Sequence, residues 1–293
     1  MKKLKFLIAL LSVGSLMTSC KDDDNSNVIP LRDYAEQYAS EISALEEYLE
    51  THYITVNSDF DYTINKIPAN GSQTPIKNHP NLTFKMVDFH DIQYKLYYIK
   101  LREGVNERPS SVDSVLVSYK GVLLDGTQFD NRPLPMWFKL DEVVVEGWKQ
   151  LIPEFKTGNF ENTDGPNPIS FTDFGAGVMF VPSGLAYYNN VTNSVPSYST
   201  MVFGFKLNGL RYRDHDGDGI LSKDEVAEPF ADPRKYDSDG DGIMNYLDVD
   251  DDNDGVLTKR EIQDGDGNRY PFDLIPTCPG GTLKRHLDPA CYQ

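Results

Sequence analysis

The segment Ser114–Phe129, SVLVSYKGVLLDGTQF, decides the fold. Its first half alternates apolar and polar side chains, which is typical of a β-strand buried on one face. The Asp125-Gly126 pair then favours a tight turn between two such strands. The segment therefore predicts a β-hairpin that presents the aromatic rings of Tyr119 and Phe129.

The residues that follow predict one short helix and three further strands. A β-branched strand at residues 143–145 leads into helical spacing around Trp148. Residues 177–181 and 200–207 are continuously apolar or strictly alternating, as expected for a half-buried antiparallel sheet. With residues 94–101 as the first sheet strand, the prediction is an α+β fold in which a curved antiparallel sheet wraps on a short helix.

Four ordered blocks of sequence resemble the FKBP-type peptidyl-prolyl cis-trans isomerases. The blocks are Val117-x-Tyr119-x-Gly121-x-Leu123-x-Asp125-Gly126-x-x-Phe129-Asp130, Val144-Val145-x-Gly147-Trp148, Pro182-x-x-Leu185-Ala186-Tyr187 and Val195-Pro196-x-x-Ser199-Thr200-Met201-Val202-Phe203. The resemblance implies an enzyme that isomerises Xaa-Pro bonds in proline-containing polypeptide clients and assists the folding of exported proteins.

The implied chemistry requires no acid, base, metal or cofactor. Isomerisation must remove amide resonance, a barrier of about 18–20 kcal/mol. A twisted amide is less polar than a planar one, so a dry apolar pocket destabilises the planar ground state more. The family pattern assigns catalytic roles to Trp148 as the pocket floor, Tyr119, Phe129 and Phe203 as walls, Val144 and Val145 facing the peptide, Tyr187 as a hydrogen-bond partner of the substrate, and Asp130 at the rim.

The chain departs from the family pattern around this pocket. Tyr188 stands where the family usually has glycine, the loop 189–194 is one residue short, and residues 159–175 are an insertion. The sequence leaves open whether Met136 or Trp137 lines the pocket. A single aromatic residue is also more often a core residue than a binding residue. For these reasons two other functions are considered. These are a noncatalytic, calcium-stabilised surface binding module and a holdase chaperone that uses apolar surface around Trp137.

The N-terminus has the features of an export signal. Lysines precede the apolar run Phe6–Met17, which is shorter than the ~20 residues needed to span a bilayer. The segment Leu16–Cys20 resembles a bacterial lipoprotein signal, which implies lipidation of Cys20. Residues Lys21–Asn25 resemble the acidic surface-export tag of Bacteroidetes lipoproteins, with a solvated linker as the alternative. We expect the protein in the cell envelope, anchored by lipid to the outer membrane on its periplasmic or cell-surface face.

The cysteine content agrees with export. Lipidation of Cys20 would leave Cys278 and Cys291, an even pair that an oxidising compartment favours as a disulfide. Closing so short a loop would stabilise the tail by about 3 kcal/mol.

Three acidic loops in the tail follow the EF-hand calcium pattern of acids at positions 1, 3, 5 and 12, glycine at 6 and a backbone carbonyl at 7. Pro229 and Pro233 leave no room for a long helix after the first loop, so the spacing resembles thrombospondin type 3 or dockerin-like repeats. Structural Ca²⁺ is expected, because it accepts more oxygens and looser geometry than Mg²⁺. The predicted ligands are Asp214, Asp216, Asp218, Ile220 and Glu225 in the first loop, Asp237, Asp239, Asp241, Ile243 and Asp248 in the second, and Asp250, Asp252, Asp254, Val256 and Glu261 in the third.

The acidity of the chain is concentrated in these loops. Between Asp214 and Asp273 there are 19 acidic and six basic residues, so 13 of the 17 net negative charges lie there. An acidic disordered tail is the alternative, but it would not repeat glycine and an apolar residue at fixed places. The net acidity argues against a nucleic-acid partner.

The residues before the sheet carry apolar side chains at helical spacing from Tyr34 to Leu49, which predicts an amphipathic helix packed on the main domain. The predicted organisation is a signal peptide at 1–19, a lipidated linker at 20–30, an N-terminal helical and irregular segment at 31–83, an FKBP-like domain at 84–212, calcium-binding repeats at 213–273 and a disulfide-closed tail at 274–293.

Overall fold

The computed structural model describes residues 31–161, 169–192 and 194–291. The described residues from Arg32 onward form one compact unit. The predicted signal peptide, the predicted linker and Cys20 lie outside the described residues. Within the described ranges, no helix has the length and apolar character needed to cross a membrane.

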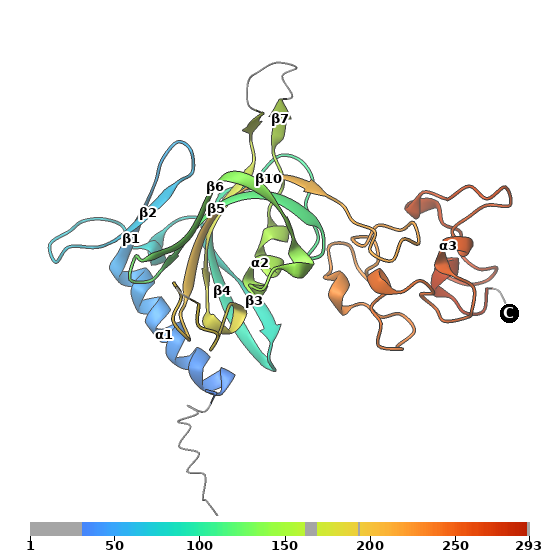
Figure 1. The fold of residues 1–293 in the computed structure, drawn as a ribbon, viewed down its shortest axis with the longest axis horizontal. Helices are drawn as coiled ribbons and strands as arrows, with labels where there is room; N and C mark the ends of the chain where they lie inside the picture. Colours follow the sequence, from blue (N-terminus) through green and yellow to red (C-terminus); the bar gives the residue numbers. More distant parts are fainter. Residues whose placement is uncertain (1–30, 162–168, 193, 292–293) are drawn as a thin grey trace, which may run out of the picture. The chain divides into compact units, whose positions relative to one another are not determined.

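A six-stranded antiparallel sheet with the order β3-β4-β9-β10-β5-β6 forms the centre of the fold (Figure 1). Its strands are β3 (Leu82–Phe89), β4 (Ile92–Arg102), β5 (Ser114–Leu123), β6 (Gln128–Lys139), β9 (Gly175–Val181) and β10 (Met201–Arg211). Two small hairpins are formed by β1 (His52–Val56) with β2 (Tyr62–Lys66) and by β7 (Asn159–Glu161) with β8 (Ser170–Thr172). The α-helices are α1 (Tyr34–Thr51), α2 (Glu146–Leu151) and α3 (Thr258–Glu261). The predicted α+β class with a curved antiparallel sheet is confirmed.

The hairpin predicted from the deciding segment is β5–β6. The two strands pair antiparallel from Ser114 opposite Lys139 to Val122 opposite Gln128. Gly126 in the turn has a φ of 87°, in the left-handed region that glycine adopts without strain.

The sheet begins one strand earlier than predicted, because β3 pairs with β4 along its whole length. The connecting residues His90 and Asp91 have φ values of 52° and 57°. Two consecutive positive φ values are typical of the turn that matches the twist of a hairpin. The turn lacks an Asn-Gly or Asp-Gly pair, so its sequence carries no strong hairpin signal.

Both faces of the sheet are covered, so the prediction of a half-buried sheet is wrong. One face packs on α2 in a core that includes Trp148 and Phe203. The opposite face packs on α1 and the β1–β2 hairpin through Phe180, Val202 and Leu45 (Figure 1). Every residue of β9 is buried as a result. A strand covered on both faces loses the alternation that marks a half-buried sheet.

The predicted strand at Val143–Val145 is also wrong. A short 3₁₀ turn at Leu140–Glu142 comes before it, and the Val143 N–H donates to the Leu140 carbonyl at 3.3 Å. The β-branched run is extended locally, but β6 already forms the edge of the sheet and no described strand pairs with this segment. Without a ladder partner, β-propensity alone produces only a loop.

The N-terminal helix α1 packs on the sheet through polar contacts as well as its apolar face. Asp33 caps the helix by accepting hydrogen bonds from two backbone N–H groups of the first turn. The Tyr38 hydroxyl accepts from the Lys95 N–H at 2.6 Å. The buried Glu41 carboxylate accepts from the Ser183 N–H at 3.1 Å, just beyond β9. The helix is therefore bonded to both β4 and the segment after β9.

Gly204 in β10 allows the β1–β2 hairpin to lie on the sheet. A Cβ at this position would overlap the Tyr62 ring, whose hydroxyl donates to the Val202 carbonyl at 3.3 Å. We expect Gly204→Ala to lower the free energy of unfolding by about 1–3 kcal/mol, as overpacked cores do. Gly209→Ala on the same strand is the control, because its nearest neighbour would be Leu116 at 3.6 Å. Equal urea midpoints for the two variants would contradict this packing argument.

Candidate active site

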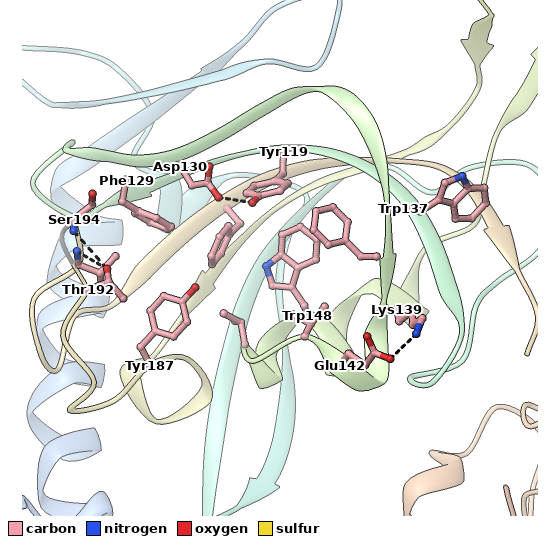
Figure 2. A pocket seen from close by; sticks show the side chains of 15 residues that line it. Tyr119, Phe129, Asp130, Trp137, Lys139, Glu142, Trp148, Tyr187, Thr192 and Ser194 are labelled. Atoms are coloured by element: carbon pink, nitrogen blue, oxygen red, sulfur yellow. Dashed lines mark hydrogen bonds and ion pairs between the residues drawn. The ribbon is translucent and has the colours of Figure 1, made fainter. Parts of the chain in front are cut away.

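A pocket of about 770 Å³ opens between the sheet and α2 (Figure 2). Side chains from β5, β6, α2, β10 and the loops before α2 and after β9 converge on it. They are Tyr119, Phe129, Asp130, Trp137, Phe138, Lys139, Glu142, Val143, Val145, Trp148, Tyr187, Thr192, Ser194, Val195 and Phe203.

Aromatic rings form the floor and walls of this pocket. Trp148, which is 3% exposed, meets Phe203 at a centroid distance of 5.5 Å and an interplanar angle of 88°. Tyr119 approaches Trp148 at 5.0 Å and 84°, and Phe129 approaches Phe203 at 5.3 Å and 88°. Edge-to-face packing of this kind is favourable and fixes ring orientation. The pocket therefore presents a preorganised apolar surface.

A polar pair lies at one side of the aromatic surface. The Tyr119 hydroxyl donates to Asp130 at 2.5 Å, and Arg132 Nε lies 3.7 Å from the other carboxylate oxygen. Burial and the Asp130 carboxylate raise the pKa of Tyr119 well above its ordinary value. Tyr119 therefore remains a hydrogen-bond donor at neutral pH, and it holds Asp130 at the rim.

Tyr187 directs its hydroxyl into the pocket (Figure 2). Burial, with a smaller contribution from Asp130, raises the pKa of this hydroxyl, so it stays protonated at neutral pH. In the described part of the chain, no hydrogen bond uses it. The group is placed to donate a hydrogen bond to a bound carbonyl.

Tyr188, the departure from the family glycine, has a φ of 51° in the left-handed region. This conformation is strained for tyrosine and unstrained for glycine. Contacts with the N-terminal segment compensate: the Tyr188 ring stacks on Tyr34 at 4.1 Å, and its hydroxyl donates to the Arg32 carbonyl at 2.5 Å. The start of α1 therefore supports the loop that rims the pocket.

The structure brings together seven of the eight residues that the family pattern assigns to catalysis. Val144 is the exception: it is 68% exposed and does not line the pocket, whereas Val143 and Val145 do. Of the pair left open, Trp137 lines the pocket margin, with the Arg211 guanidinium 4.2 Å from its ring, and Met136 does not.

Sequence reasoning missed several lining residues on β6 and on the pocket loops. They are Phe138, Lys139, Glu142, Val143, Thr192, Ser194 and Val195. Trp137, Phe138 and Lys139 line the pocket consecutively and Met136 does not, so strand alternation did not single out Phe138. The remaining residues lie on two loops, and the sequence carried no signal for how these loops fold.

The acidic loops bring carboxylates together in the tail. Asp214 with Asp216 and Asp218, Asp237 with Asp239 and Asp241, and Asp250 with Asp252 and Asp254 each place ligand atoms within 4.8 Å of one another. The carbonyl oxygens of Ile220, Ile243 and Val256 accept no hydrogen bond from the described residues. The glycines at the sixth positions, Gly219, Gly242 and Gly255, all have positive φ. This geometry matches the turn that the calcium pattern requires.

The residue at the twelfth position differs among the three loops in its hydrogen bonding. Glu225 and Glu261 are almost fully buried, and all four of their carboxylate oxygens lack hydrogen-bond partners. Burial and neighbouring carboxylates raise the pKa of Glu225 to about 10 and that of Glu261 to about 8. Asp248 instead accepts a hydrogen bond from the Asp250 N–H at 3.0 Å. Buried carboxylates without partners are costly unless a cation neutralises them, so these donor sets suit a divalent metal.

Comparison with known proteins connects the pocket to a family. Residues 105–208 match the family model of FKBP-type peptidyl-prolyl cis-trans isomerases. The matched range contains all the residues that line the pocket. FkpA of Escherichia coli K12, an FKBP-type peptidyl-prolyl cis-trans isomerase, is 33% identical over 115 residues, which are 38% of this chain and 36% of the relative. FkpA of Aeromonas hydrophila is 30% identical over 126 residues, 42% and 41% of the two chains. The chain thus matches less than half the length of these relatives.

Two solved structures are also similar to this chain. The crystal structure of FkpA from Escherichia coli has a TM-score of 0.39 at 23% identity and covers 60% of this chain and 62% of its own. A Pseudomonas syringae peptidyl-prolyl cis-trans isomerase has a TM-score of 0.35 at 24% identity, covering 46% and 84%. Residues 211–285, after the range that matches the first family model, match a second family model described as BamM C-terminal. That description does not mention calcium or thrombospondin-type repeats.

Polar contacts join the tail to the domain that holds the pocket, on both sides of the pocket segment 142–145. Arg213 Nη1 lies 2.6 Å from Asp141, just before the lining residues Glu142, Val143 and Val145. The Arg234 guanidinium donates two hydrogen bonds to Glu146, at 2.8 and 3.0 Å, at the start of α2. The segment 141–146 is therefore held at both ends.

At the C-terminal end, Cys278 and Cys291, the pair expected from the cysteine count, form a disulfide with a Cα–Cα distance of 5.4 Å.

Proposed function

We propose that the protein is a peptidyl-prolyl cis-trans isomerase that assists the folding of exported, proline-containing polypeptides. The observation that carries the proposal is the preorganised aromatic pocket floored by Trp148, in a domain that matches the FKBP type. Prolyl isomerisation requires a barrier to rotation to be lowered and no bond to be broken. An apolar pocket with a few hydrogen-bonding groups fits this requirement.

In the proposed mechanism, the proline ring packs on Trp148 and the edges of Phe129 and Phe203. The preceding carbonyl leaves water and receives a hydrogen bond from the Tyr187 hydroxyl. In these surroundings the planar, charge-separated amide loses more solvation than the twisted amide, so the barrier falls. The Tyr119–Asp130 pair keeps the rim in place and excludes water from that side of the pocket.

The test is isomerisation of an Xaa-Pro peptide by the full chain, followed by NMR exchange or a protease-coupled assay. We expect Phe129→Ala and Tyr187→Phe each to lower kcat/KM by about tenfold or more, since each removes transition-state contacts worth over 1 kcal/mol. Phe160→Ala is the matched control, because Phe160 is 65% exposed on β7 and outside the pocket. Turnover by the wild-type protein at the uncatalysed rate would overturn the proposal.

A second candidate function is binding without catalysis, as a surface module or a holdase. It is favoured by the exposed apolar side chains of Leu134, Met136 and Trp137 on β6, with exposures of 79%, 41% and 40%. Contiguous exposed apolar surface is typical of interaction sites. Suppression of aggregation that survives Phe129→Ala would support this candidate.

We also propose that the acidic loops bind structural Ca²⁺. The donors are the carboxylates grouped in the three loops and the carbonyls of Ile220, Ile243 and Val256, supported by the buried, unpartnered oxygens of Glu225 and Glu261. The ion would supply positive charge that folds the loops and take no part in isomerisation. Lipidation of Cys20 and anchoring to the outer membrane rest on the N-terminal sequence alone.

A further inference from the structure

We propose that Asp251 completes the first calcium loop from the third, so that one ion joins the two loops. The proposal rests on the calcium binding proposed above. Asp251 is the second residue of the loop Asp250–Glu261, and the calcium pattern assigns no ligand to the second position. The sequence therefore offers no reason to count Asp251 as a ligand, and the assignment comes from the fold.

The carboxylates of Asp218, Glu225 and Asp251 place ligand atoms within 4.8 Å of one another. The three residues are 2%, 3% and 2% exposed. Five of their six carboxylate oxygens have no hydrogen-bond partner: one of Asp218 and both of Glu225 and Asp251. Three buried carboxylates this close cannot stay ionised together without a cation between them. Asp218 belongs also to the group formed with Asp214 and Asp216, which places Asp251 at the same ion.

The protein's own charges do not balance this cluster. Arg269 is the basic residue that acts on Asp218, while Asp214 adds negative charge there. The groups that act most strongly on Glu225 and Asp251 are other carboxylates. One guanidinium against this many acids leaves a net negative site, and a hard divalent cation with oxygen ligands fits it.

The backbone fixes Asp251 in the orientation that the shared site needs. Its N–H donates to the Thr258 hydroxyl at 3.0 Å in the third loop, and its carbonyl accepts from the Ser238 hydroxyl at 2.5 Å in the second. Residues 250–253 form a turn, in which the Asn253 N–H donates to the Asp250 carbonyl at 3.1 Å. Asp250 and Asp252 group with Asp254 of their own loop, whereas Asp251 groups with Asp218 and Glu225 of the first loop. Folding of the first loop around its ion depends on the third loop being in place.

The test compares calcium binding to the full chain by isothermal titration calorimetry after EGTA treatment. We expect Asp251→Asn to lose one bound Ca²⁺ or to weaken one site by about tenfold or more, because each carboxylate removed lowers affinity. Asp266→Asn is the matched control, since Asp266 is exposed and outside the carboxylate groups. The double variant Asp251→Asn/Glu225→Gln should lose no more ions than either single variant, because both residues would hold the same ion.

Thermal unfolding supplies a readout that does not depend on activity. In EGTA, Asp251→Asn should unfold at a higher temperature than the wild type, because folding no longer has to desolvate or protonate one buried carboxylate. In calcium, it should unfold at a lower temperature. Wild-type stoichiometry and affinity in Asp251→Asn, or loss of two ions in the double variant, would overturn the shared site while leaving the loops as calcium sites. A wild-type chain that binds no Ca²⁺ would overturn both.

Discussion

Replacing Arg234 with alanine is expected to lower the free energy of unfolding by about 3 kcal/mol, because the buried Glu146 carboxylate then keeps only the weaker ion pair with Lys149, at 3.8 Å. Arg234 bonds both oxygens of Glu146, and the side chain of Glu146 is only 9% exposed. Asp232 also loses its hydrogen bonds at 2.7 and 2.9 Å from the same guanidinium. Urea unfolding monitored by Trp fluorescence, in the presence of calcium, measures the change.

The matched controls separate charge from packing in this prediction. Lys235→Ala removes a neighbouring positive charge that is exposed and forms no ion pair with a described residue, so its effect should be below about 0.5 kcal/mol. Glu146→Gln combined with Arg234→Ala should recover part of the lost stability, because the buried carboxylate at the start of α2 is then gone. If Arg234→Ala is as stable as Lys235→Ala, the contact does not hold the tail on the domain.

Removal of calcium is expected to lower the unfolding temperature by at least about 10 °C, because three sites at saturating calcium would contribute several kcal/mol. The carboxylates of Glu225, Asp251 and Glu261 would then remain buried together without compensating charge. Scanning calorimetry in calcium, in EGTA and after calcium is returned measures the effect. Mg²⁺ should restore less of the stability, because it prefers stricter octahedral geometry. Superimposable scans in all conditions would mean that the loops are held by other forces.

Removal of calcium is also expected to weaken peptide binding in the pocket. The tail contacts Asp141 and Glu146, which lie on either side of the lining residues 142–145. Loosening these contacts should raise KM for a peptide more than it lowers kcat, because the wall that receives the substrate becomes less ordered while Trp148 stays in the core.

Local signals in the sequence predicted the parts of the fold that depend on neighbouring residues. The β5–β6 hairpin follows from alternation and the Asp125-Gly126 turn, and the aromatic pocket follows from the ordered family blocks. The errors concern partners distant in sequence. The covered second face of the sheet depends on α1, which is more than a hundred residues away from β9. The conformation at Val144 depends on whether a strand lies beside it. The proposed role of Asp251 as a ligand depends on how two loops meet. Such contacts are determined by topology, and the sequences of the segments themselves show no periodic pattern that would predict them.

The position of β4 between β3 and β9 affects how the chain folds during synthesis. Residues 92–102 pair on one side with their immediate neighbour β3, but on the other side with residues 175–181. Because a chain is made from its N-terminus, the hydrogen-bonding edge of β4 stays open until about eighty further residues have emerged. An open edge of this kind can pair with the wrong strand. A protein that we propose helps other chains to fold therefore has a vulnerable interval in its own folding.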